Sequence, residues 1–132
     1  MTITRHGITE ATEGRPIIST IPIISRVVVR DDTVYVCGVT ANVFSTDDIR
    51  MQTKEALDTI DRLLRTGGTD KSNLLTAQVW LSDMSLFEAH NAVWNEWVDP
   101  KNAPVRACVR AELWRPNLLV EIMVTAARPS GA

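Results

Sequence analysis

The segment approaching the C-terminal end of the chain alternates charged and small apolar side chains. Four side chains that could bind or react occupy every second position: Arg106, Cys108, Arg110 and Glu112. Between them stand small apolar side chains: Val105, Ala107, Val109 and Ala111. Successive side chains of a β-strand point to opposite faces, so each set would share one face of a sheet. Because the apolar set suits a helix-covered face, we expect the charged set on the opposite face, toward a ligand or neighbouring subunits.

A lone carboxylate follows this segment. Glu121 is the only charged residue in the apolar run Leu118–Ala126, where a carboxylate needs a partner or a raised pKa. Residues 114–117, Trp-Arg-Pro-Asn, form a typical turn sequence. We therefore expect the strands 105–113 and 118–126 to pair as an antiparallel hairpin.

The hairpin register decides which groups meet. Pairing Leu113 with Leu118 puts Glu121 opposite Arg110, and a slip of two residues puts it opposite Cys108. Both registers place Glu121 on the face of the arginines. One interpretation is a cross-strand ion pair that holds the sheet. The other is a binding site in which Arg106 grips a carboxylate with two N–H groups and Glu121 orients or deprotonates a water.

The rest of the chain must supply the elements that position these residues. The patterns predict the order β-β-α-β-α-β-β, which is typical of an α+β fold. We expect two strands between Ile17 and Cys37 with a turn at 30–33, then a helix over 46–66 that ends at Gly67-Gly68. A strand at Leu74–Leu81 follows. A second helix should run from the capping box Ser85-x-x-Glu88 to Asp99-Pro100, before the two strands described above. Two helices cover one face of such a sheet, so we expect self-association to cover the other.

Composition narrows the classes of function. The 132 residues fit a single domain, 1–132, and a net charge of −2 without a basic run argues against a nucleic-acid partner. The two cysteines and the lack of a signal pattern or long apolar run predict a soluble, cytoplasmic protein with no membrane partner. His6, near an end expected to be unstructured, and His90, on an apolar helix stripe, are expected to be non-catalytic. With no ligand spacing among histidines and cysteines, we expect no metal site.

Several short motifs together resemble a known family. Pro104-Val-Arg106-Ala-Cys108-Val109, followed fifteen residues after the arginine by Val120-Glu121-Ile122, resembles the C-terminal signature of the YjgF/RidA family, also labelled endoribonuclease L-PSP-like. Supporting matches precede it: Val36-Cys-Gly38, Gln52-Thr, Val79-Trp-Leu-Ser-Asp83 and Phe87-Glu-Ala-His-Asn91-Ala. The resemblance covers roughly residues 25 to 127.

This resemblance implies a chorismate-mutase-like (bacillus type) fold, a mixed sheet with two helices on one face, and a homotrimer whose sheets form a central barrel with three inter-subunit clefts. Family enzymes of the RidA type hydrolyse enamine and imine intermediates to 2-keto acids and ammonia without a cofactor. Carried over, Arg106 would bind the carboxylate of a small imino-acid substrate and Glu121 would position the water. Cys108, Gly38 and Asn91 would line the cleft, and Trp114, at the tip of the expected hairpin, could shape it.

One departure bears on activity. Where RidA-type members carry a Gly-Pro-Tyr-Ser-Gln-like segment, this chain has Ile21-Pro-Ile-Ile24-Ser25-Arg26, so Ile24 stands at the position of the family tyrosine. The sequence therefore leaves three hypotheses: an enamine/imine deaminase, a non-catalytic binding protein for small carboxylate metabolites, and the ribonuclease of the older family label.

Overall fold

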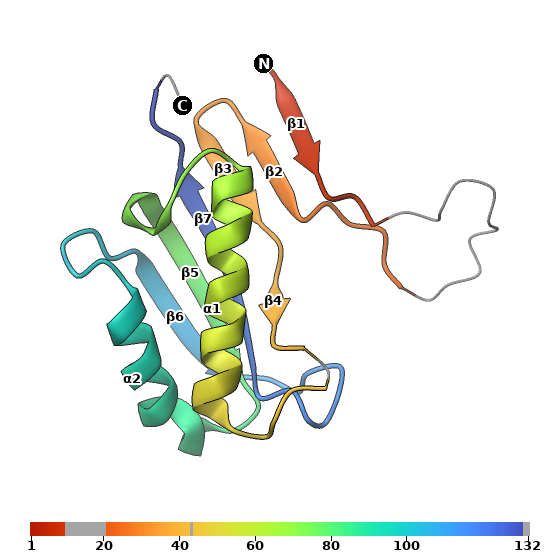
Figure 1. Ribbon diagram of the computed structural model, residues 1–132, viewed down its shortest axis with the longest axis vertical. Coiled ribbons are helices and arrows are strands. Elements are labelled where there is room, and N and C mark those ends of the chain that lie inside the picture. Colours follow the sequence, from red (N-terminus) through yellow and green to blue (C-terminus); the bar gives the residue numbers. More distant parts are fainter. Residues whose placement is uncertain (10–20, 43, 131–132) are drawn as a thin grey trace.

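The protein folds as an α+β domain in which two helices cover one face of a mixed sheet. The computed structural model describes residues 1–9, 21–42 and 44–130. Its elements are β1 (Ile3–His6), β2 (Val27–Arg30), β3 (Thr33–Val36), β4 (Val39–Thr40), α1 (Ile49–Thr66), β5 (Leu74–Leu81), α2 (Phe87–Trp97), β6 (Val105–Arg110) and β7 (Val120–Ala127). The strand order is β1-β2-β3-β7-β5-β6, with β4 also paired to β7. Both helices lie on the same side of this sheet (Figure 1).

The N-terminal half of the sheet is built from hairpins. β2 and β3 pair antiparallel around Asp31, whose positive φ of 51° closes the tight turn that the charged tetrad 30–33 predicted. The expected strand before it is shorter than predicted: residues 17–20 lie outside the described residues, and 21–26 form no strand. The N-terminus, expected to be unstructured, instead pairs with β2 as the edge strand β1.

The two helices match their predicted ranges to within three residues, but neither has the N-cap that the sequence predicts: the first helix, expected from Ser45, begins after Asp48. The Asp48 side chain accepts a hydrogen bond from the Arg50 N–H and begins α1, and the backbone N–H of Gly67 donates to the last turn. The capping box at Ser85 is wrong. Asp83 instead caps a short 3₁₀ turn at Met84–Leu86, and α2 continues from that turn without a side-chain cap of its own.

The predicted C-terminal hairpin is also wrong, because β5 lies between its two strands. β6 pairs with β5 in parallel, and β7 pairs with the other edge of β5 in antiparallel. The α2 crossover returns the chain beside β5, since parallel neighbours require such a connection. β7 buries Val120, Ile122 and Val124 under the helices, so this apolar strand occupies the centre of the sheet rather than its edge.

A β-bulge interrupts the pairing of β3 and β4 with β7. Tyr35 pairs with Thr125 and Val39 pairs with Ile122, so four steps along one strand face three along the other. Gly38 lies in this bulge, between the two short strands. No helix among the described residues is both long and apolar enough to cross a membrane.

The Asp48 cap gives a first test of the fold. We expect Asp48→Ala to lower the free energy of unfolding by about 1 kcal/mol, because the first turn of α1 loses the acceptor for an orphan N–H. Denaturant unfolding at fixed protein concentration measures this loss. The matched control is Asp47→Ala, an exposed neighbour whose side chain is not the cap. Equal effects of both changes would contradict a specific role for Asp48.

Candidate functional site

The two residues with the strongest predicted roles lie on opposite faces of the sheet. Arg106 pairs with Ala77, and Ala77 is buried beneath the helices. Glu121 pairs with Trp80, one position out of phase with the buried set on β5. Paired residues share a face, so Arg106 belongs to the helix-covered face and Glu121 to the open one. The predicted placement of the charged set on the open face is therefore wrong, and Val105, Ala107 and Val109 take that place.

The same geometry overturns both predicted registers. Arg110 pairs with Leu81 and Cys108 with Val79, again on the helix-covered face, so neither lies opposite Glu121. Within the part of the chain that the structure describes, the one ion pair within 4.0 Å joins Lys54 to Asp58 on the surface of α1. The cross-strand ion pair is thus not what holds Glu121.

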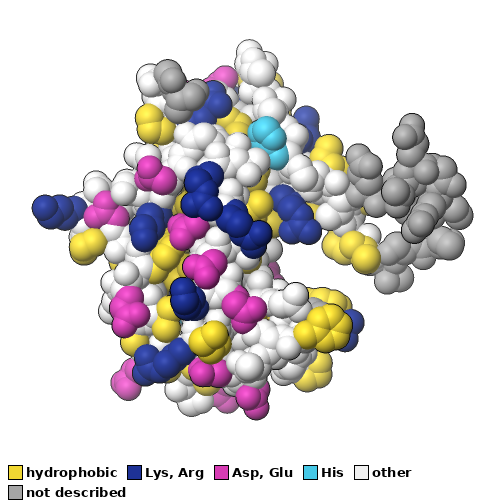
Figure 2. All heavy atoms as spheres, viewed as in Figure 1, with side chains coloured by type: hydrophobic (Ala, Val, Ile, Leu, Met, Phe, Trp, Pro, Cys, Tyr) yellow, Lys and Arg dark blue, Asp and Glu magenta, His cyan; other side chains and the backbone are white. Residues whose placement is uncertain are grey.

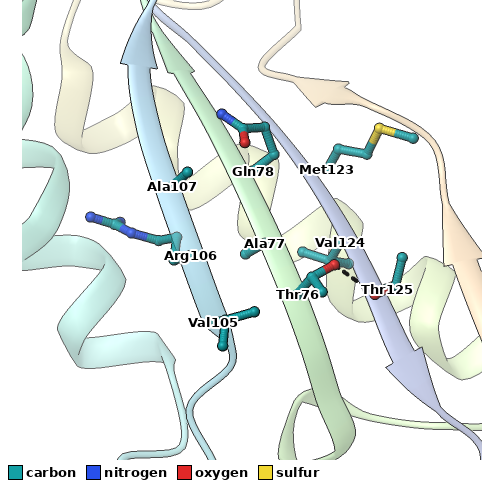
Figure 3. Close-up of a pocket in the computed structure, with 9 residues that line it drawn as sticks. All are labelled: Thr76, Ala77, Gln78, Val105, Arg106, Ala107, Met123, Val124 and Thr125. Atoms are coloured by element: carbon teal, nitrogen blue, oxygen red, sulfur yellow. Dashed lines mark hydrogen bonds between the residues drawn. The ribbon is translucent and has the colours of Figure 1, made fainter.

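Arg106 is held at the edge of the sheet by side chains of α2. Its Nη2 donates to Asn91 Oδ1 over 2.8 Å, and its guanidinium carbon lies 5.0 Å from the centre of the Trp94 ring. Such stacking adds a cation–π attraction to the hydrogen bond. In Figure 3, Arg106 extends outward from β6, away from Met123 and Gln78. Asn91, expected to line the cleft, positions the arginine.

His90 completes the support of Arg106. The ring is fully buried, with Nδ1 3.0 Å from Thr53 Oγ1 and Nε2 3.4 Å from Arg106 Nη1. Burial, followed by the nearby Arg106 charge, lowers the pKa of His90 to about 4. The imidazole is therefore neutral at physiological pH. His6, by contrast, lies on β1 at the other edge of the sheet, so the two histidines form no catalytic pair.

The backbone of β6 faces outward beside Arg106. Ala111 donates its N–H to the Leu81 carbonyl, which fixes the alternation of the parallel ladder between β5 and β6. By that alternation, the N–H and C=O groups of Arg106, Cys108 and Arg110 point away from β5, off the edge of the sheet. An unpaired strand edge of this kind can bind a ligand or another chain.

Glu121 occupies a crowded position on the open face. Its pairing partners are Trp80 on β5 and Thr40 on β4, which flank it on that face. Partial burial raises the pKa of its carboxyl group above the ordinary value. A Cβ added at Gly38 would lie 2.5 Å from Glu121 Oε2, so a side chain in the bulge would displace the carboxyl group from its present position. Gly38 thus lies beside the Glu121 carboxyl group.

The two cysteines differ from reactive thiolates. Burial raises the pKa of the Cys108 thiol and outweighs the opposing charge of Arg106. Burial also raises the pKa of the Cys37 thiol. The positive charge of Arg26 lowers this pKa and the negative charge of Glu121 raises it, but each effect is smaller than that of burial. Both thiols are therefore protonated at neutral pH, and Cys108 is suited to lining a site rather than to nucleophilic attack.

Trp114 does not lie at the tip of a hairpin, because β6 and β7 do not pair with each other. It belongs to the loop that carries the chain from β6 across the end of β5 to β7. Its ring is exposed and is stacked by Arg115, whose guanidinium carbon lies 4.5 Å from the ring centre. Together with Arg110, these side chains line a surface hollow of about 480 Å³ beyond the end of β6.

The open face carries a shallow hollow between β6, β5 and β7. Its volume is about 430 Å³, and it is lined by small and polar side chains with Met123 at one side (Figure 3). Within it the hydroxyl groups of Thr76 and Thr125 lie 2.6 Å apart. Exposed apolar side chains surround the hollow on the same face, namely Tyr35, Val105, Val109 and Met123. The face thus has the mixed character of a protein interface.

The helix-covered face carries charges of both signs. Figure 2 shows lysine and arginine side chains interspersed with aspartate and glutamate over the helices, without a patch of one sign. Among residues 1–9, 21–42 and 44–130, no group of three or more histidine, cysteine, aspartate or glutamate side chains could hold a metal ion.

Sequence reasoning missed the residues that support the site. Thr53, His90 and Trp94 hold Arg106, and Trp80 and Thr40 flank Glu121. One signal was available for the first group. A histidine on the apolar stripe of a helix must satisfy two ring nitrogens once buried, which calls for polar partners nearby.

Comparison with known proteins agrees with these features. The sequence model of the family described as endoribonuclease L-PSP matches residues 18–128. A RutC family protein from Haemophilus influenzae and the RutC family protein YoaB from Escherichia coli are each 40% identical over 103 residues, covering 78% of this chain and 89% of theirs. The crystal structure of a YjgF family member from Neisseria meningitidis has a TM-score of 0.84 at 32% identity, covering 99% of this chain and 98% of that one.

The matched segment contains both strands that carry Arg106 and Glu121, as well as both helices. The structural match extends over nearly the whole of both chains, with the same mixed sheet and pair of helices. This chain belongs to the YjgF/RidA family.

Proposed function

We propose that this protein hydrolyses small reactive 2-imino and 2-enamino acids to 2-keto acids and ammonia, without a cofactor, at clefts between its own copies. One observation carries the proposal. A fixed guanidinium, Arg106, lies at the sheet edge, and a carboxyl group of raised pKa, Glu121, lies on the opposite face. The first group suits a substrate carboxylate, and the second suits proton transfer, because its pKa is raised above that of an ordinary carboxyl group.

The binding half of the site is the outer edge of β6. Asn91 and His90 take one N–H from each terminal nitrogen of Arg106, so the guanidinium keeps donors for a ligand carboxylate. The outward N–H groups of β6, including that of Cys108, lie next to it and can donate to the same ligand. Two parallel charge-assisted bonds would fix the plane of the carboxylate and hence the direction of the imine carbon.

The reacting half is Glu121. In the proposed reaction, a water oxygen forms a bond to the imine carbon while Glu121 accepts a proton from that water. The π electrons of the imine move to the nitrogen, and the same carboxyl group gives the proton to that nitrogen, which forms a neutral amino alcohol. Glu121 then takes the hydroxyl proton and passes it to the nitrogen as the carbon–nitrogen bond breaks, so the oxygen becomes the keto group of the 2-keto acid and ammonia leaves. A carboxyl group with a raised pKa can serve in both directions, since its protonated and ionised forms are closer in free energy.

Both halves can act on one substrate only if they come from different copies. Within one chain Arg106 and Glu121 lie on opposite faces of the sheet, with β5 between their strands. In a closed ring each copy could present its β6 edge to one neighbour and its open face to the other. The exposed apolar side chains of the open face favour such an assembly, and we propose a trimer.

A second candidate is a binding protein without turnover, and Ile24 is the observation that favours it. Its backbone is tied to Thr9 by hydrogen bonds in both directions, and its side chain is partly exposed. It cannot supply the hydroxyl group that RidA-type members carry there. In this case Arg106 would hold a carboxylate metabolite unchanged. Ammonia release from generated 2-aminoacrylate separates the two candidates.

The assembly is tested by mass in solution. We expect light scattering at micromolar concentration to give three times the chain mass of 14.7 kDa. Met123→Lys should shift this mass toward the monomer, because it places a charge on the open face. Met51→Lys, at an equally exposed position on α1, is the matched control and should leave the trimer intact. A monomeric wild-type protein would rule out the shared site.

Complementation tests whether each site draws on two copies. We expect Arg106→Lys to weaken binding of 2-keto acids by about 1.5–3 kcal/mol, since lysine lacks the planar fork. Co-assembly of this variant with Glu121→Gln in equal amounts should then restore about a quarter of wild-type turnover, the fraction of interfaces in a closed ring that combine both intact halves. If both residues served one site within a single chain, co-assembly would restore none.

Glu121→Gln alone separates catalysis from stability. We expect imine hydrolysis to fall by about 10²-fold or more, because the amide cannot take up a proton. The melting temperature should not fall. Since burial raises the pKa of Glu121, the ionised form is disfavoured in the folded state, and a neutral amide of similar shape removes that penalty. A lower melting temperature with unchanged ammonia release would remove Glu121 from the mechanism.

A further inference from the structure

We propose that His90 is a positioning residue for Arg106: its neutral imidazole, locked by Thr53, accepts an N–H from the guanidinium and so fixes the direction of the remaining donors. The inference rests on the proposed role of Arg106 in carboxylate binding. It concerns a part of α2 that lies behind the site rather than in it. His90 itself is fully buried and cannot reach a ligand.

The first step is that His90 is bonded at both ring nitrogens, on two different elements. Thr53 of α1, also fully buried, lies 3.0 Å from Nδ1, and Arg106 of β6 lies 3.4 Å from Nε2. The imidazole therefore links α1, α2 and the edge strand. Buried polar side chains joined in this way restrict one another, because each can leave only by abandoning a partner in a dry interior.

The second step assigns the ring proton. A guanidinium can only donate, so Nε2 must present its lone pair to Arg106 Nη1. In a neutral imidazole the proton is then on Nδ1, which donates to Thr53 Oγ1. Arg106 thus sets the tautomer, and the Thr53 hydroxyl, which can accept or donate, holds the ring by accepting the Nδ1 proton. The other tautomer would place two N–H groups against each other.

The third step is how three contacts fix one guanidinium. The cation–π attraction to Trp94 holds the guanidinium over the ring, and the Asn91 bond fixes the position of Nη2. One bond still permits rotation about the bonded atom. The contact of Nη1 with His90 removes this rotation, even though 3.4 Å is long for a hydrogen bond. The N–H on Nε and the second N–H of each terminal nitrogen are then left for a ligand.

The test compares three folded variants by affinity for pyruvate and by turnover of generated 2-aminoacrylate. His90→Leu keeps the apolar bulk but removes the acceptor. We expect it to raise the dissociation constant and KM about threefold to tenfold with kcat nearly unchanged, since Arg106 grips the carboxylate equally before and during the reaction. His90→Gln, which retains an acceptor, should recover most of the affinity.

The matched control is Thr69→Val. It also removes a hydrogen bond of a buried side chain, that of Thr69 Oγ1 to the Ala127 carbonyl on β7, two strands away from β6. It should lower the melting temperature without changing KM. A folded His90→Leu protein with unchanged affinity for pyruvate would overturn the proposal. So would equal effects of the Leu and Gln variants.

A spectroscopic measurement keeps the proposal testable if His90→Leu does not fold. In wild-type protein, the ¹⁵N resonances of the His90 ring should report the neutral form protonated at Nδ1 at neutral pH, and Arg106→Lys should shift the Nε2 resonance. Protonation at Nε2, or no response to Arg106→Lys, would refute the contact. These spectra need no substrate. A wild-type protein that neither binds pyruvate nor releases ammonia would therefore sink the proposed function while leaving the His90 test to be decided separately.

Discussion

The position of β5 between β6 and β7 determines how the whole site is built. Because a parallel neighbour needs a crossover, α2 must pass over the sheet before β6 begins, and this brings its side chains directly above the edge strand. The same arrangement sets the phase of β6 and β7 against β5. Arg106 is in phase with the buried residues of β5, whereas Glu121 is in phase with the half-buried residue Trp80 on the other face. A change of strand order would change both assignments at once.

α2 consequently both covers the core and positions a side chain of the site. One side of the helix covers the core with Trp94, while His90 and Asn91 on the same short segment fix the orientation of Arg106. The opposite half of the site is supported differently. The position of the Glu121 carboxyl group depends on the bulge and on the absence of a side chain at Gly38. Side-chain contacts thus position Arg106, whereas the local backbone leaves the space that the carboxyl group of Glu121 occupies.

The sequence predicted local structure well and long-range pairing poorly, and the reason is physical. The range of α1, the strand Leu74–Leu81 and the turn at Asp31 follow from caps, periodicity and turn chemistry within a few residues. The order of β5, β6 and β7 depends on contacts between distant segments that no local pattern encodes. The hairpin expected across 114–117 places Arg106 on the wrong face, although motif spacing does single it out as a candidate for ligand binding. The role of His90 required knowing which helix lies over which strand.

The buried imidazole of His90 also makes the stability of the fold depend on pH. An unfolded chain protonates His90 near pH 6.5, whereas the folded chain keeps it neutral down to about pH 4. Between these values folding expels a proton from this ring, so its contribution to stability is complete above the unfolded pKa and declines as the pH falls toward 4. Once charged, the ring would face Arg106 as a like charge in a dry interior. The side chain that orients the guanidinium would then destabilise the packing of α2 on the sheet. We therefore expect the contact between α2 and the sheet to be sensitive to acid.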